Sequence, residues 1–134
     1  MLSKIALDTN VLLHLYDEQD GAKRQTAARL LAENPVVSAQ VISEFLNAVR
    51  RVAGLNKDQA LGAAVQLFAA CPIAPVTHAT LVYATRLLAR YDFQLFDVII
   101  VAAAPEAGCD TLYPADFQHN QLVEGRLWLL NPFK

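Results

Sequence analysis

The chain has 134 residues, a formal net charge of −2, 54% hydrophobic residues and 18% charged residues. This length fits one domain over residues 1–134, and the composition excludes a disordered chain, which needs low hydrophobicity and high net charge. No apolar run reaches the roughly 20 residues that span a bilayer, and the first apolar run is too short for a signal peptide. We therefore expect a cytoplasmic protein that has no membrane partner.

The first third of the chain alternates short apolar segments with helical patterns. Residues 4–7 predict a strand that stops at Asp8, a short helix follows from Val11, and residues 22–33 have the apolar spacing of a longer helix. A short strand is expected at 35–37, and Ser38 is placed to cap the next helix. That helix has one apolar face, formed by Val41, Ile42, Phe45, Leu46 and Val49.

The middle of the chain continues this alternation. Asn56, followed three residues later by Gln59, resembles a capping box for a helix that runs to about residue 70. A strand is expected within 71–76. Thr77 can cap a helix over 78–91, whose inward-facing residues are expected to be Leu81, Leu87 and Leu88.

The last third of the chain contains an apolar run that is either a buried helix or a strand. Its alanines, and the sequence 106–108 after them, favour a helix that ends at Gly108. Pro105 conflicts with this, because a proline inside a helix removes a hydrogen bond, and we expect a distortion or early end near residues 101–104. Strands are expected at 111–113 and 128–130. Strands that alternate with helices predict an α/β fold, with a mostly parallel sheet covered on both faces.

Four acidic residues are the candidates for chemistry. In such a sheet, sites form outside the carboxyl ends of the strands; Asp8 follows the first strand and Asp116 the fourth, while Glu44 and Asp97 lie in apolar surroundings. If these carboxylates converge, their repulsion raises a pKa or recruits a cation. A hard divalent ion such as Mg²⁺ suits oxygen ligands, and such a site activates water for phosphodiester hydrolysis.

Each of these acids also has a purely structural alternative. Asp8 and Asp97 could cap helices, and Asp116 could be a turn residue after Pro-Ala. Glu44 lies about 130° from the centre of the apolar face at about 100° per residue, so it could be a solvated helix residue. The residues by themselves leave these alternatives open.

Other polar residues carry weaker indications. Neither zinc nor a redox pair is indicated by Cys71 and Cys109, which form no C-x-x-C motif, and we expect reduced, buried thiols. His119 is either a surface loop residue or lies near the site. Four arginines are either solvated helix residues or phosphate contacts: Arg50, Arg51, Arg86 and Arg90.

Ordered segments of the chain resemble the PIN-domain family, and within it the VapC-type toxins of bacterial toxin–antitoxin pairs. They are residues 7–12 (LDTNVL), 38–45 (SAQVISEF), 97–104 (DVIIVAAA) and 108–119 (GCDTLYPADFQH), and the resemblance runs from about residue 4 to residue 132. It implies an α/β/α sandwich with a short central parallel sheet. It also implies an endoribonuclease that depends on Mg²⁺ or Mn²⁺, in which a metal-activated water attacks the RNA.

The resemblance further implies roles and partners. Carried over by position, the acidic metal site would comprise Asp8, Glu44, Asp97 and Asp116, with Asp8 and Asp97 as the most direct ligands. Thr9 and Asn10 resemble the polar residues that orient Asp8. A VapB-like antitoxin, whose tail covers the acidic groove, and a homodimer are the implied protein partners. The chain departs from the family pattern at Pro105 and at Pro114-Ala115, where related chains often carry a serine and an acid.

Other functions place an Asp after a strand as well. A haloacid-dehalogenase-like phosphatase needs an Asp two residues after its nucleophile, where this chain has Asn10. A receiver domain needs a late-strand lysine, and the sequence has no lysine between Lys57 and Lys134. A non-catalytic PIN-fold RNA-binding module is the remaining alternative, although such a binder has no use for four buried like charges.

Overall fold

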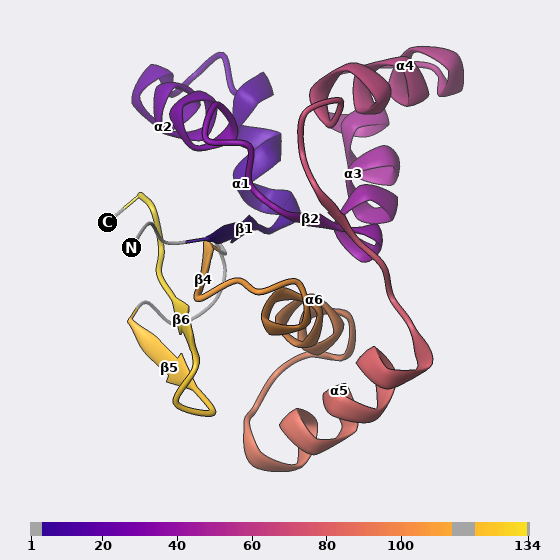
Figure 1. Cartoon of the computed structure of the whole chain (residues 1–134). Helices are drawn as coiled ribbons and strands as arrows, with labels where there is room; N and C mark the ends of the chain where they lie inside the picture. Colours follow the sequence, from indigo (N-terminus) through magenta and orange to yellow (C-terminus); the bar gives the residue numbers. More distant parts are fainter. Residues whose placement is uncertain (1–3, 114–119, 134) are drawn as a thin grey trace.

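A short, mostly parallel sheet organises the computed structural model, which describes residues 4–113 and 120–133 (Figure 1). Within this part of the chain, one sheet has the order β1–β4–β6–β5, in which β5 is antiparallel to β6 and the other pairs are parallel. A parallel pair, β2–β3, joins it through a bridge between Ala6 and Val36. The strands are β1 (Ile5–Leu7), β2 (Val37–Ser38), β3 (Ile73–Ala74), β4 (Thr111–Tyr113), β5 (Gln121–Val123) and β6 (Leu127–Leu129).

Helices cover the sheet from two sides. In Figure 1, α1 to α4 lie above the line of β1 and β2, while α5 and α6 lie below it. This arrangement confirms the α/β/α class that the sequence predicts. The helices are α1 (Thr9–Leu13), η1 (His14–Tyr16), α2 (Gly21–Leu31), α3 (Ala39–Val52), α4 (Lys57–Leu67), α5 (His78–Arg90) and α6 (Leu95–Glu106).

The predicted helix caps are confirmed. The Ser38 hydroxyl accepts a hydrogen bond from the backbone N–H of Val41 at 3.1 Å, which satisfies a free donor at the start of α3. Capping boxes begin α4 at Asn56 and α5 at Thr77. A cap depends only on residues three positions apart, so it is readable without the tertiary structure.

The core is built around the predicted apolar face of α3. Val41, Phe45 and Val49 are completely buried, and the Phe45 ring meets the Phe68 ring edge-on at 5.4 Å between centroids. Ile42 and Leu46 pack against this core from its margin. Burial of this face therefore holds α3, which carries Glu44, against the rest of the molecule.

Pro105 does not end α6 near residues 101–104, so the early end that the sequence allowed is wrong. The helix continues to Glu106, although the proline has no N–H to donate to the carbonyl four residues earlier. The chain then leaves the helix through a Schellman motif: the N–H of Cys109 donates to the carbonyl of Ala104 at 3.0 Å and the N–H of Gly108 to that of Pro105 at 2.9 Å. Gly108 has φ +83°, a conformation that glycine adopts without strain.

The orientation predicted for α5 is wrong at two of its three leucines. Leu87 is buried, but Leu81 and Leu88 are 45% and 44% exposed. The helix buries a different face, which contains Thr80 and Ala84, because these small residues let α5 pack closely on α6. The two exposed leucines are therefore left as apolar surface.

The hairpin of β5 and β6 is only partly predicted by the sequence. β5 is not expected from it, and β6 begins at Leu127 rather than at Trp128. Three residues connect the paired Val123 and Leu127, and two of them, Glu124 and Gly125, have left-handed φ values of +53° and +65°. A glutamate is an unusual residue at such a position, so the local pattern does not reveal the turn.

Both cysteines are free and buried, as expected. Burial raises the pKa of the Cys109 thiol to about 11, although the nearby Lys4 ammonium opposes this, and burial also raises the pKa of Cys71. Among the described residues, no helix has the length and apolar character needed to cross a membrane.

The raised pKa of Cys109 predicts a masked thiol. The unfolded thiol has a pKa of about 8.5, so folding holds the proton more tightly, and the free energy of unfolding is expected to fall as the pH rises from about 9 to 11. At pH 8 the native protein should react slowly with an aromatic disulfide reagent and rapidly in guanidinium. A Cys109→Ala variant should lose most of this alkaline dependence; an unchanged dependence would contradict the assignment.

Candidate acidic site at the carboxyl end of the sheet

Asp8 lies where two neighbouring parallel strands end. It follows β1 directly, and its backbone N–H donates to the carbonyl of Tyr113, the last residue of β4, at 3.2 Å. The side chain is only 3% exposed, and its Oδ1 accepts a hydrogen bond from the backbone N–H of Thr9 at 2.6 Å. Asp8 therefore caps α1, as its structural alternative predicts, and it also occupies the edge of the sheet where sites form in α/β folds.

Thr9 and Asn10 have different surroundings. Thr9 is buried, and its hydroxyl donates to the carbonyl of Val41 in α3 at 3.5 Å, so its backbone rather than its hydroxyl contacts Asp8. This bond ties the start of α1 to α3. Asn10 is half-buried and lines a groove beside the site.

Glu44 is a half-buried residue of α3, one turn after Val41. Gln40 donates from Nε2 to its Oε2 at 2.9 Å, which fixes the direction of the carboxylate. Sequence reasoning missed Gln40, although its spacing of four residues from Glu44 within a helix is the one at which side chains meet.

Asp97 lies in the first turn of α6 and is half-buried. The N-cap of this helix is Gln94, so Asp97 is not the capping residue that its structural alternative predicts. A carboxylate in the first turn is favoured by the partial positive charge of the helix N-terminus.

The elements that carry these acids are in contact with one another. α3 packs against both α1 and α6, so the regions of Asp8, Glu44 and Asp97 belong to one part of the molecule. Within residues 4–113 and 120–133, no three His, Cys, Asp or Glu side chains lie close enough together to hold a metal ion. Asp116 and His119 lie outside the described residues, so the four-acid metal site stays a prediction. The donor chemistry suits Mg²⁺, which binds through one or two carboxylates and retains several waters.

A groove of about 960 Å³ adjoins this region at Asn10. It runs between η1 and the end of α3, and its lining is partly apolar, with Leu13, Leu15, Val52 and Leu55, and partly charged, with Asp17, Glu18 and Arg24.

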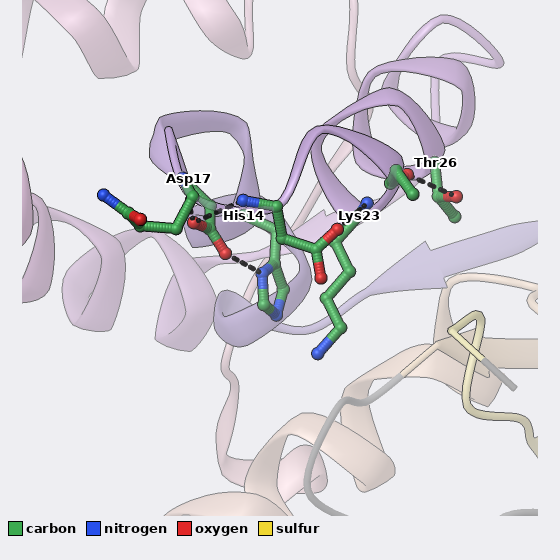
Figure 2. A network of polar contacts seen from close by, with 7 residues as sticks. His14, Asp17, Lys23 and Thr26 are labelled. Carbon is green, nitrogen blue, oxygen red and sulfur yellow. Dashed lines mark hydrogen bonds and ion pairs between the residues drawn. The ribbon is translucent and has the colours of Figure 1, made fainter.

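One wall of this groove carries the polar network in Figure 2. The His14 Nδ1 lies 3.4 Å from the Asp17 Oδ2, and the backbone N–H of Gln19 donates to the Asp17 carboxylate at 2.9 Å. Chiefly because of that N–H, and with help from His14, the pKa of Asp17 lies below its usual value. The η1–α2 corner is thus held by hydrogen bonds within its own segment.

Comparisons with known proteins bear on both the fold and the chemistry. The family model of the PIN domain matches residues 5–123. The crystal structure of the VapC20 toxin of Mycobacterium tuberculosis, described as a toxin that cleaves the sarcin–ricin loop, is 26% identical, with a TM-score of 0.68 over 92% of this chain and 99% of that chain.

Two toxin–antitoxin complexes bound to DNA share the fold at lower identity. VapBC2 of Rickettsia felis, bound to a promoter fragment, is 18% identical, with a TM-score of 0.69 over 95% of this chain and 97% of that chain. DNA-bound VapBC of Salmonella typhimurium is 12% identical, with a TM-score of 0.72 over 98% of this chain and 99% of that chain. Comparison with curated proteins gives no significant match.

Proposed function

Because the chain belongs to the PIN-domain family, we propose that it is a metal-dependent endoribonuclease and the toxin of a toxin–antitoxin pair, acting as a single domain over residues 1–134. The observation that carries this proposal is the Asp8 carboxylate, buried at the ends of β1 and β4 at the start of α1, which packs on the Glu44 helix α3, itself packed on the Asp97 helix α6. The likeness to VapC20 supports the choice of RNA as the substrate.

In this proposal the carboxylates hold Mg²⁺ or Mn²⁺, with Asp8 and Asp97 as direct ligands and Glu44 and Asp116 completing the site. The bound ion supplies Lewis acidity toward the phosphodiester and an activated water. The chain positions its own ligands: the N–H of Thr9 orients Asp8, and Gln40 orients Glu44. Asn10 lies at the junction of this site and the groove.

The experiment that tests the proposal is RNA cleavage by the purified chain, freed of any partner. It is incubated with total bacterial RNA and Mg²⁺ or Mn²⁺, and the new 5′ ends are sequenced. We expect discrete cuts that disappear with a chelator and in an Asp97→Asn preparation. Equal cuts from both preparations would reveal a contaminant, and RNA binding by both without any cuts would favour the non-catalytic RNA-binding module.

An antitoxin is the proposed regulatory partner, since the similar structures include VapB–VapC pairs. The groove beside Asn10 is large enough for a peptide segment, and its apolar and charged lining suits an amphipathic one. Such a segment would lie next to the acidic site and block access of RNA. Added antitoxin should therefore suppress the cleavage described above, and undiminished cleavage by the stable complex would contradict this placement.

A homodimer is the other proposed assembly, and the exposed leucines of α5 support it. Leu81 and Leu88 lie on one face of the helix and are open to a second copy. Wild-type protein is expected to have the mass of a dimer in light scattering, and Leu81→Glu/Leu88→Glu the mass of a monomer, because burying two carboxylates in an interface is unfavourable. The control is Leu61→Glu on α4, also an exposed leucine. If the wild-type protein had the mass of a monomer, or if only the Leu61→Glu control dissociated, this face of α5 would not be the dimer interface.

A further inference from the structure

A second pocket, of about 790 Å³, lies at the end of α6 remote from Asp97. Glu106, the last residue of α6, lines it and follows Asp97 by nine residues, about 14 Å along a helix. The other walls are α5 and the turn between β5 and β6. The lining includes the basic side chains of Arg86, Arg90 and Arg126.

The carboxylates in this lining are already engaged. The Arg90 Nη1 lies 2.7 Å from the Glu124 Oε1, and the Tyr91 hydroxyl donates to the other oxygen of Glu124 at 3.1 Å. Glu106 accepts a hydrogen bond from the buried Thr80 hydroxyl at 2.6 Å. Arg90 is therefore paired with a carboxylate of the hairpin turn.

Arg86 and Arg126 line the same pocket as Tyr83. The Arg86 guanidinium is 5.4 Å from the centre of the Tyr83 ring. Burial raises the pKa of Tyr83; the positive charges of Arg126 and Arg86 lower it, and the negative charge of Glu124 raises it. Within the described part of the chain, neither arginine forms an ion pair with a carboxylate. The pocket thus brings together two guanidinium groups from distant segments that form no ion pair in this part of the chain, alongside the carboxylates of Glu106 and Glu124.

We propose that this pocket binds the phosphate backbone of the RNA substrate at a point away from the cleaved bond, through Arg86 and Arg126. The inference rests on the proposed ribonuclease function. Guanidinium groups bind phosphate oxygens in a bidentate manner, and both arginines are exposed, which suits a ligand that lies across the surface. Proteins that bind single strands through OB folds contact about 4–16 nucleotides per fold, so one strand can contact points at both ends of a helix such as α6.

The test measures RNA binding separately from cleavage. Asp97→Asn protein, with and without Arg86→Gln/Arg126→Gln, is titrated with a fluorescent uridine 20-mer in EDTA at several salt concentrations. Each phosphate contact on a single strand contributes about 0.7 to the slope of log K against log salt, so the slope should fall by about 1.4. Affinity at low salt should fall about tenfold or more. The matched control is Arg29→Gln/Lys57→Gln, which removes the same charge from exposed positions on α2 and α4.

Several outcomes would overturn this inference. An unchanged slope would show that neither arginine contacts the RNA, and an equal change in the control would show that only the net charge matters. Inorganic phosphate or uridine monophosphate that binds as tightly as the 20-mer would assign the pocket to a small phosphate compound instead. Thermal unfolding checks that both double variants are folded. RNA cleavage by the wild-type protein is measured separately. If there were no cleavage, the proposed nuclease function would be wrong, but a smaller salt dependence of binding in the Arg86→Gln/Arg126→Gln variant would still support an RNA-binding pocket.

Discussion

An Asp97→Asn variant is expected to lose RNA cleavage by at least about a hundredfold, with its fold intact. A metal ion contributes several kcal/mol of transition-state stabilisation to phosphodiester hydrolysis, and each 1.36 kcal/mol is a factor of ten in rate. The amide keeps the size of the side chain but removes the charge that would hold the ion. Asp8→Asn is expected to lose a similar factor, because Asp8 is buried at the end of β1 and would be the second direct ligand.

The control for this experiment is Asp110→Asn. Asp110 is an exposed acid that precedes β4, so it lies at the opposite end of the sheet from Asp8, and its carboxylate accepts a hydrogen bond only from a neighbouring residue, Thr111, among the described contacts. The Asp110→Asn variant should therefore cleave RNA at the full wild-type rate. Rates are compared at saturating Mn²⁺ on the same RNA, with circular dichroism as the check on folding. Full activity of Asp97→Asn, or equal loss in Asp110→Asn, would exclude the assigned metal site.

A Phe45→Ala variant is expected to lose about 3–5 kcal/mol of folding free energy, the usual cost of removing a buried phenylalanine. Phe45 has no exposed surface, and its ring contacts Phe68 at 5.4 Å and Tyr16 at 6.2 Å between centroids. These partners lie at the C-cap of α4 and in η1, so the cavity would loosen the packing around α3. In thermal unfolding, the midpoint is expected to fall by on the order of 10–20 °C.

Leu61→Ala serves as the comparison for Phe45→Ala. Leu61 is 57% exposed on α4, so its truncation leaves no cavity and is expected to change stability by no more than about 0.5 kcal/mol. Denaturant titration of both variants gives the free energies directly. If the two variants were equally stable, Phe45 would not be the central core residue that its burial indicates.

The candidate site was only partly predictable from the sequence. The order of its acids along the chain and the position of Asp8 at a strand end follow from local patterns. The sequence does not decide whether Asp8 caps a helix or binds a metal ion, because both roles use the same carboxylate. The contact between Gln40 and Glu44 was not predicted either. Their spacing of four residues permits the contact, but the rotamers that the packed helix allows decide whether it forms.

What the sequence by itself determined is local: the caps at Ser38, Asn56 and Thr77, the buried face of α3, and the glycine turn at Gly108 that follows α6. Each depends on residues within about one helical turn of one another, where propensity and hydrogen bonding act without distant partners.

Only the tertiary structure decided which face of α5 is buried, how β5 pairs, and which arginine is neutralised. Arg90 meets Glu124 across 34 positions of chain, and Leu81 is exposed because small residues elsewhere on α5 pack closely on α6. These outcomes depend on contacts between elements far apart in the sequence, and packing between such elements overrides the local preference of any single helix.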